Sequence, residues 1–100
     1  MRPIVLAELG GKVRPAVVLT REVILPRLTN VTLAPITSTI RGISTEVPVG
    51  PENGIEHESV ISCDNIQTVP QSLVMRHLGH LSPEQEAALT EAILVAFDLY

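Results

Sequence analysis

Residues 10–19 have the sequence Gly10-Gly11-Lys12-Val13-Arg14-Pro15-Ala16-Val17-Val18-Leu19. Glycine adopts positive φ without steric cost, so the glycine pair predicts a tight turn between two strands. The aliphatic run that follows predicts a strand over residues 13–20 that is buried on both faces. Arg14 stands where the turn enters this strand, and its planar guanidinium matches a phosphate bidentately. The stretch therefore predicts a hairpin with a fixed cation at one end.

A second predicted strand, residues 30–36, ends in hydroxyl side chains, because residues 37–44 form a Ser/Thr-rich loop. Thr37 at this strand end can donate a hydrogen bond to a phosphate oxygen, or bond to its own loop backbone instead. Arg14 taken alone is more typical of a surface residue at a strand end, paired with Glu8 or Glu22. The two strand ends together predict a small anion site.

The rest of the chain predicts short strands and one helix. Residues 21–29 form a connection with room for one helical turn, and a turn cluster occupies residues 50–54. Ser82 is a predicted N-cap, Pro83 suits the first helical position, and Gln85 completes a capping box before an apolar run ending at Phe97. The pattern predicts a mainly β (α+β) fold, a small, strongly bent sheet or barrel with a C-terminal helix. Its further strands are predicted at residues 3–8, 45–49, 58–64 with 66–69, and 73–81.

The helix is apolar over much of its surface, which indicates that it is covered on more than one side. A subunit interface and a helix sunk deep into its own sheet explain this equally well.

Composition places the 100 residues in one domain, residues 1–100, with 45% hydrophobic and 18% charged residues. The net charge is −4, but residues 1–50 hold six basic and three acidic residues, whereas residues 51–100 hold one basic and eight acidic residues. A basic N-terminal surface could therefore face a polyanion, although charge alone favours the simpler interpretation that the asymmetry keeps a small protein soluble. One Phe and one Tyr are too few for base stacking to dominate such binding. With no predicted membrane segment or signal peptide, we expect a cytoplasmic protein.

Other candidate side chains are less specific. Arg27 and Arg41 could follow a phosphate backbone, and Asn65 could contact a base, although each is individually typical of an ordinary surface. His57 is a possible acid–base group. The sequence contains no Cys/His spacing of a zinc site, and Cys63 is expected to be a buried apolar filler. His77 and His80 are expected on opposite faces of a strand, which makes them a poor metal pair.

Three segments in register resemble toxins of the MazF/PemK type, and the predicted cap and helix agree with them. Residues 10–19 resemble the family's Gly-Gly-x-Arg-Pro turn and strand, and residues 31–38 its strand ending in Ile-Thr. Residues 59–69 resemble its Ser-Val-Ile stretch and the polar turn that follows. The short mycobacterial-type branch is the nearest match, through Leu-Thr-Arg-Glu at 19–22 and Glu-Val-Pro-Val at 46–49.

The resemblance implies a homodimer of SH3-like, CcdB-type plug barrels. It implies a toxin of a type II toxin–antitoxin system, a ribosome-independent endoribonuclease that cuts single-stranded RNA at short sequences and so inhibits translation and growth. It implies no metal, cofactor or membrane, a cognate antitoxin that occludes the RNA groove, and DNA contact only through an antitoxin complex. The family's catalytic arginine and threonine fall on Arg14 and Thr37, and its RNA-contacting polar residue falls on Asn65. RNA contacts are expected from Lys12, Arg27, Ser38, Arg41, Asn65 and Gln67.

Two other functions remain open from the sequence. One toxin family of the same fold poisons DNA gyrase without cutting RNA, and SH3-like barrels also serve as non-catalytic interaction modules. The presence of both Arg14 and Thr37 at matched positions favours RNA cleavage over the gyrase poison.

Overall fold

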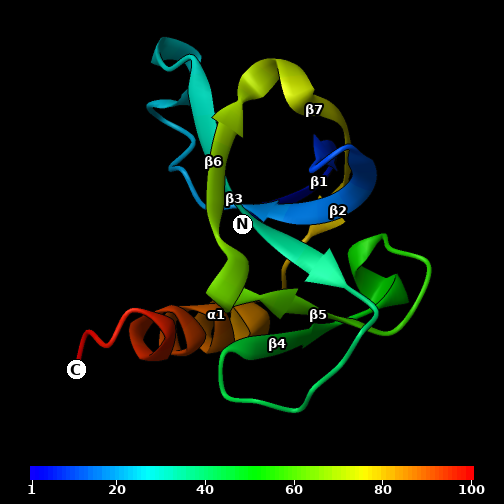
Figure 1. The fold of residues 1–100 in the computed structure, drawn as a ribbon, viewed down its shortest axis with the longest axis vertical. Helices are drawn as coiled ribbons and strands as arrows, with labels where there is room; N and C mark the ends of the chain where they lie inside the picture. The colour runs from blue at the N-terminus through cyan, green and yellow to red at the C-terminus, as the bar shows by residue number, and fades with distance from the viewer.

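The computed structural model describes Met1 to Tyr100 as one seven-stranded sheet with a C-terminal helix (Figure 1). All the strand pairs are antiparallel, and the path through the sheet is β4-β5-β3-β2-β1-β7, with β6 added beside β3. The expected mainly β fold with a C-terminal helix is confirmed. The elements are β1 (Pro3–Leu9), β2 (Lys12–Val18), β3 (Asn30–Thr37), β4 (Glu46–Val49), β5 (Ser59–Ser62), β6 (Gln67–Pro70), β7 (Val74–His80) and α1 (Pro83–Ala96), with 3-10 turns η1 (Leu25–Arg27), η2 (Pro51–Asn53), η3 (Cys63–Asn65) and η4 (Gln71–Leu73).

Strand β3 changes partner along one of its edges. Its first half pairs with β6 over residues 30–33, and its last two residues pair with β5. Turn η3 lies between β5 and β6 and fills the gap where the change occurs. The strand predicted over residues 58–64 therefore ends at Ser62, because Cys63 begins this turn.

Two hydrophobic clusters lie on opposite faces of the β2–β3 region. The larger contains Val17 and Ile36 together with Leu89 and Ala92 of the helix. The smaller contains Ala16, Val18 and Leu33 with residues of β1. Because neighbouring strand residues point to opposite faces, Val17 and Val18 enter different clusters. This confirms burial on both faces for residues 16–18.

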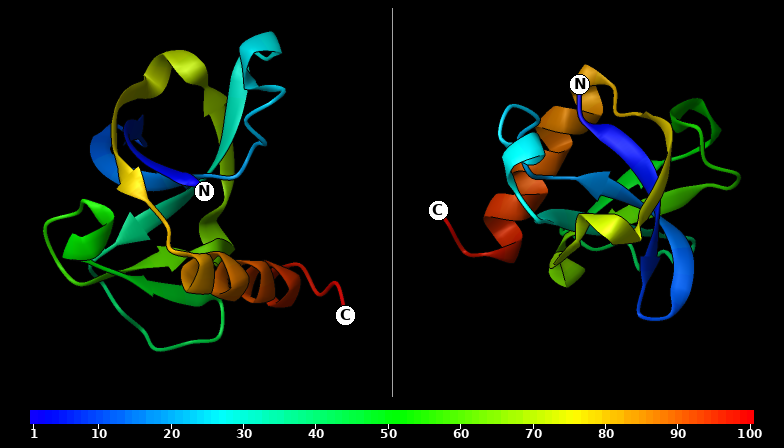
Figure 2. Two further views of the ribbon diagram at one scale, coloured as in Figure 1. Left: turned by 180° about the vertical axis from the view of Figure 1, so that it is seen from behind. Right: turned by 90° about the horizontal axis from the view of Figure 1, so that it is seen from above.

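The helix begins with the predicted capping box. The Gln85 backbone N–H donates to Ser82 Oγ at 3.1 Å, and the Ser82 N–H donates to Gln85 Oε1 at 2.9 Å. Only Leu89 and Ala92 are fully buried within the helix. The helix is therefore not sunk deep into its own sheet, and Figure 2 shows it lying along one side of the molecule. At 14 residues, α1 is also too short to cross a membrane.

A buried amide joins the start of the helix to the sheet. Asn53 is 3% exposed, and its Nδ2 donates to the His80 carbonyl at 2.9 Å and to Gln85 Oε1 at 2.7 Å. Its Oδ1 accepts from the Gly50 N–H and from Gln85 Nε2, both at 3.0 Å. Next to it, Gly54 approaches the backbone of β7 so closely that an added Cβ would lie 2.2 Å from the Leu78 carbonyl oxygen.

The expected separation of His77 and His80 is wrong. Their ring centroids lie 4.6 Å apart. Strand β7 has a register shift against β1, since Ile4 pairs with Gly79 whereas Val5 pairs with His77. The unpaired Leu78 interrupts the alternation of side chains and brings both imidazoles to one side.

Candidate functional site

The register between β2 and β3 brings the two predicted strand ends together. Ala16 pairs with Pro35, and extending this antiparallel register by two residues sets Arg14 opposite Thr37. Both side chains then share the face of Ala16 and Pro35, because residues two apart on a strand point the same way. Strand pairing stops at Ala16, and a hollow opens between the strands beyond it.

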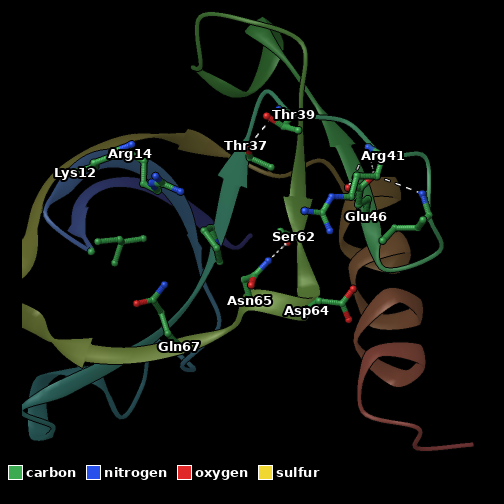
Figure 3. A pocket seen from close by; sticks show the side chains of 14 residues that line it. Lys12, Arg14, Thr37, Thr39, Arg41, Glu46, Ser62, Asp64, Asn65 and Gln67 are labelled. Atoms are coloured by element: carbon green, nitrogen blue, oxygen red, sulfur yellow. Dashed lines mark hydrogen bonds between the residues drawn. The ribbon is translucent and has the colours of Figure 1, made fainter.

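We call this space the central hollow; its volume is about 600 Å³ (Figure 3). Its walls come from the β1–β2 turn, the end of β3, the loop before β4, and turn η3 with its flanks. Only two lining residues are hydrophobic, so the hollow suits a polar or charged ligand. The lining residues are Leu9, Gly10, Lys12, Arg14, Pro35, Thr37, Thr39, Arg41, Ile43, Glu46, Ser62, Asp64, Asn65 and Gln67.

A second space, the side hollow, has a volume of about 510 Å³ and shares Lys12, Arg14 and Thr37 with the central hollow. It also contains Ser38, together with His57 and Arg76. Arg14 and Thr37 thus stand on the wall common to both spaces. An extended chain lying across this wall would place one unit in each hollow.

Arg14 is half-buried, and no carboxylate lies within ion-pair distance of it. The alternative pairing with Glu8 or Glu22 does not occur, since the ion pair within 4.0 Å joins His57 Nε2 and Glu56 Oε2 at 3.7 Å. The Arg14 guanidinium, which carries five N–H donors, therefore lines the two hollows with no carboxylate within 4.0 Å of it.

The Thr37 hydroxyl is bonded to its own loop backbone, which was one of the two alternatives considered for it. Its Oγ1 accepts a hydrogen bond from the Thr39 N–H at 3.1 Å, which orients the side chain at the strand end. A hydroxyl that accepts through oxygen still has its own hydrogen to donate. Thr37 can therefore donate to an anion held by Arg14.

Turn η3 supplies the opposite wall of the central hollow. Asn65 Nδ2 donates to Ser62 Oγ at 2.7 Å, which leaves Oδ1 as an outward acceptor. Gln67 lies opposite Leu33 in the β3–β6 register, so it shares the face of Thr37. Amide groups at these positions can both donate to and accept from the edge of a nucleobase.

Most of the predicted site residues line a hollow. Lys12, Arg14, Thr37, Arg41, Asn65 and Gln67 line the central hollow, and Ser38 lines the side hollow. Arg27 does not. It lies in η1, just before β3 begins, whereas Thr37 ends that strand about 23 Å away at the usual rise per residue. Arg27 therefore lies apart from the other predicted site residues.

Sequence reasoning missed four polar residues of the central hollow, namely Thr39, Glu46, Ser62 and Asp64. Thr39 follows the second motif and Glu46 stands in the Glu-Val-Pro-Val segment, whereas Ser62 and Asp64 flank Cys63 in the third motif. Attention to the neighbours of the motifs could have found them. Cys63 itself is buried, as expected. Burial, and secondarily the negative charge of Asp64, raises the pKa of its thiol to about 11, so it is not a nucleophile at neutral pH.

Comparisons with known proteins agree with this architecture. Residues 3–97 match the family described as PemK-like, MazF-like toxin of type II toxin-antitoxin system. The endoribonuclease MazF3 of Mycobacterium tuberculosis is 58% identical over 99 residues, which cover 99% of this chain and 95% of that protein. The probable endoribonuclease MazF5 of the same organism is 36% identical over 94 residues, which cover 93% of this chain and 84% of that protein.

Among solved structures, the Mycobacterium tuberculosis toxin MazF-mt6 superposes with a TM-score of 0.94 at 57% identity, covering 97% of both chains. A MazE-MazF structure from Deinococcus radiodurans has a TM-score of 0.80 at 20% identity, which shows the shared fold; the match covers 95% of this chain and 90% of that chain. The chain belongs to the PemK/MazF-like family of toxins from type II toxin–antitoxin systems.

Proposed function

We propose that this protein is the toxin of a type II toxin–antitoxin system and that it inhibits translation by cutting single-stranded RNA at short sequences, without the ribosome. The observation that carries the proposal is that Arg14 and Thr37 both line the central hollow and the side hollow, and so stand on the wall between them. The 58% identical relative named an endoribonuclease supports RNA cleavage over gyrase poisoning. We propose that one domain, residues 1–100, performs this function in the cytoplasm.

The reaction proposed is attack by a ribose 2′-hydroxyl on the adjacent phosphorus. The bond from phosphorus to the 5′-oxygen breaks, giving a 2′,3′-cyclic phosphate and a 5′-hydroxyl. The attacking 2′-hydroxyl loses its proton, and the departing 5′-oxygen takes one up. Arg14 would bind the non-bridging oxygens as negative charge grows on them, and Thr37 would donate to one of those oxygens. These are preorganised donors, because β2, β3 and the Thr39 N–H hold them in place.

RNA would lie across the shared wall with neighbouring nucleotides in the two hollows. Lys12, Arg41 and Ser38 would contact phosphates, and Asn65 and Gln67 would contact bases from the η3 side. The protein works as a homodimer, and a cognate antitoxin blocks the RNA groove. MazE-MazF structures among the fold relatives support the antitoxin partnership.

Incubation of the purified protein with a mixed pool of single-stranded RNA in EDTA tests this function. We expect cleavage at a short sequence, with cyclic phosphate and 5′-hydroxyl ends that sequencing of the fragments identifies. Arg14→Ala should lower the single-turnover rate by about 10²–10³, the usual cost of removing one preorganised donor. Thr37→Val should have a similar effect.

Two variants serve as controls. Thr37→Ser keeps the donor and should retain most of the rate, and Arg21→Ala removes an exposed cation outside both hollows and should cleave like wild type. Cleavage that survives Arg14→Ala would rule out the role of Arg14. Inhibition of gyrase supercoiling without RNA cleavage would rule out the proposed function itself.

A further inference from the structure

The loop between β3 and β4, residues 38–45, forms one wall of the central hollow. It has no regular secondary structure, and Thr39, Arg41 and Ile43 face the hollow from it. Gly42 adopts φ +72°, with no atom within 4 Å of the position a Cβ would take. Such a loop needs side-chain anchors if it is to keep one shape.

The first anchor is the carboxylate of Glu46, the half-buried first residue of β4. Its Oε1 accepts from the Gly42 N–H at 2.8 Å and from the Arg41 N–H at 3.1 Å, with the Ile43 N–H at 3.5 Å. Oε2 lies 3.3 Å from the Arg41 nitrogen. Consecutive backbone N–H groups thus converge on one carboxylate as they would on a bound anion, and Figure 3 shows Arg41 and Glu46 together at the loop wall.

The second anchor ties the loop to turn η3. The buried Thr45 donates from Oγ1 to Asp64 Oδ2 at 2.6 Å, and its carbonyl accepts from the Cys63 N–H at 3.0 Å. The loop wall and the η3 wall of the central hollow are therefore linked. The loop shape that Glu46 sets is therefore held in a fixed position relative to Asn65 of η3.

A carboxylate beside a phosphate-binding hollow repels RNA, so its presence at this position calls for a structural reason. Here Oε1 makes most of the bonds, and all of its partners are backbone N–H groups of the residues around Arg41. We propose that Glu46 is a positioning residue: it shapes loop 38–45 before RNA arrives, so that Arg41 is presented to a phosphate of the bound strand. This inference rests on the proposed endoribonuclease function, and it concerns affinity for RNA rather than the chemical step.

Kinetics on a single-stranded RNA that contains the mapped cleavage site test the proposal. Glu46→Ala should raise KM about tenfold and leave kcat within about twofold, because binding is lost and chemistry is not. Glu46→Gln keeps the one oxygen that accepts most of the bonds, so it should raise KM less than about threefold. In an Arg41→Ala background, Glu46→Ala should have almost no further effect, since its action passes through Arg41.

A second variant perturbs the same loop, so that the test does not depend on Glu46→Ala alone. Gly42→Ala strains the loop at positive φ without changing any charge. It should raise KM in the same way and lose its effect when Arg41 is also alanine. Glu22→Gln removes an exposed carboxylate that lines neither hollow and should leave both constants unchanged.

The outcomes separate the two proposals. If wild type cleaves RNA but the Glu46 and Arg41 effects simply add, or if Glu46→Ala and Glu46→Gln both lower KM, the positioning role is wrong and the endoribonuclease remains. A fall in kcat equal to the fall in kcat/KM would also overturn it. If wild type neither binds nor cleaves single-stranded RNA, the proposed function fails, and the role of Glu46 fails with it.

Discussion

Among single residues, Gly54 and Gly42 allow the cost of positive φ to be separated from the cost of a close backbone contact. Both have positive φ, but only Gly54 faces backbone, with the Leu78 carbonyl oxygen 2.2 Å from an added Cβ. Gly42→Ala should cost about 1–2 kcal/mol in unfolding free energy, the usual cost of a left-handed alanine. Gly54→Ala should cost clearly more, because η2 and β7 must also move apart.

Urea unfolding of both variants, followed by circular dichroism, measures this difference. Equal midpoints for the two variants would mean that the close approach of Gly54 to β7 contributes nothing to stability. The comparison holds the chemical change constant, so the difference reports the backbone contact alone.

The candidate site was predictable at the level of residue type and strand end. Arg14, Thr37 and Asn65 each stood in a recognisable motif, and all three line the central hollow. Glu46 was not predictable, because its role depends on loop N–H groups that converge only after folding. Arg27 lies before β3 begins and Thr37 lies at its end, so the length of β3 separates the two residues.

Among the elements, the junction of η2, β7 and α1 depends on the reciprocal amide pair of Asn53 and Gln85. Asn53→Ala would leave the Gly50 N–H and the His80 carbonyl without their partner. Each unpaired buried group costs about 1–3 kcal/mol, so the two together should lower the unfolding free energy by about 2–6 kcal/mol.

Gln71→Ala is the matched amide control for this prediction. Gln71 Nε2 donates to the Leu25 and Leu28 carbonyls near the surface, where water can replace it. Its loss should cost less than about 1 kcal/mol in the same urea titration. A cost for Asn53→Ala no larger than this would show that the buried junction does not hold the helix start.

The sequence patterns placed every strand and the helix to within a few residues, because their apolar runs and caps are local signals. They did not show the break at Cys63, since a buried apolar residue continues a strand pattern as well as it starts a 3-10 turn. The sequence also did not show the bulge at Leu78, because an apolar residue there continues the strand pattern. Both depend on how β3 and β1 meet distant strands.

For the whole molecule, the apolar segment at the end of the helix predicts where two copies meet. Phe97 and Leu99 are 53% and 62% exposed in the single chain. We expect Phe97→Asp with Leu99→Asp to shift the homodimer toward monomer, because burying two carboxylates in an apolar contact is costly. Sedimentation equilibrium at a series of concentrations measures the change.

Val23→Asp makes the same kind of substitution at a residue 82% exposed in the connection between β2 and β3. It should leave the dimer intact. If the double variant stays dimeric at all concentrations, the subunit interface lies on another face of the molecule. Sequence alone left this helix undecided, and its exposed apolar end is what distinguishes the alternatives.

The change of partner along β3 bears on how such an enzyme could diversify. Turn η3 sits in the gap between β5 and β6, where Asp64 and Asn65 are exposed although strands flank them on both sides. Substitutions at exposed positions usually change stability by less than about 0.5 kcal/mol. Asn65 can therefore be exchanged with little risk to folding, while Arg14 stays fixed by pairing with β1 and Thr37 by pairing with β5. We therefore expect single mutations at Asn65 to change the RNA preference while the proposed catalytic pair, Arg14 and Thr37, stays in place.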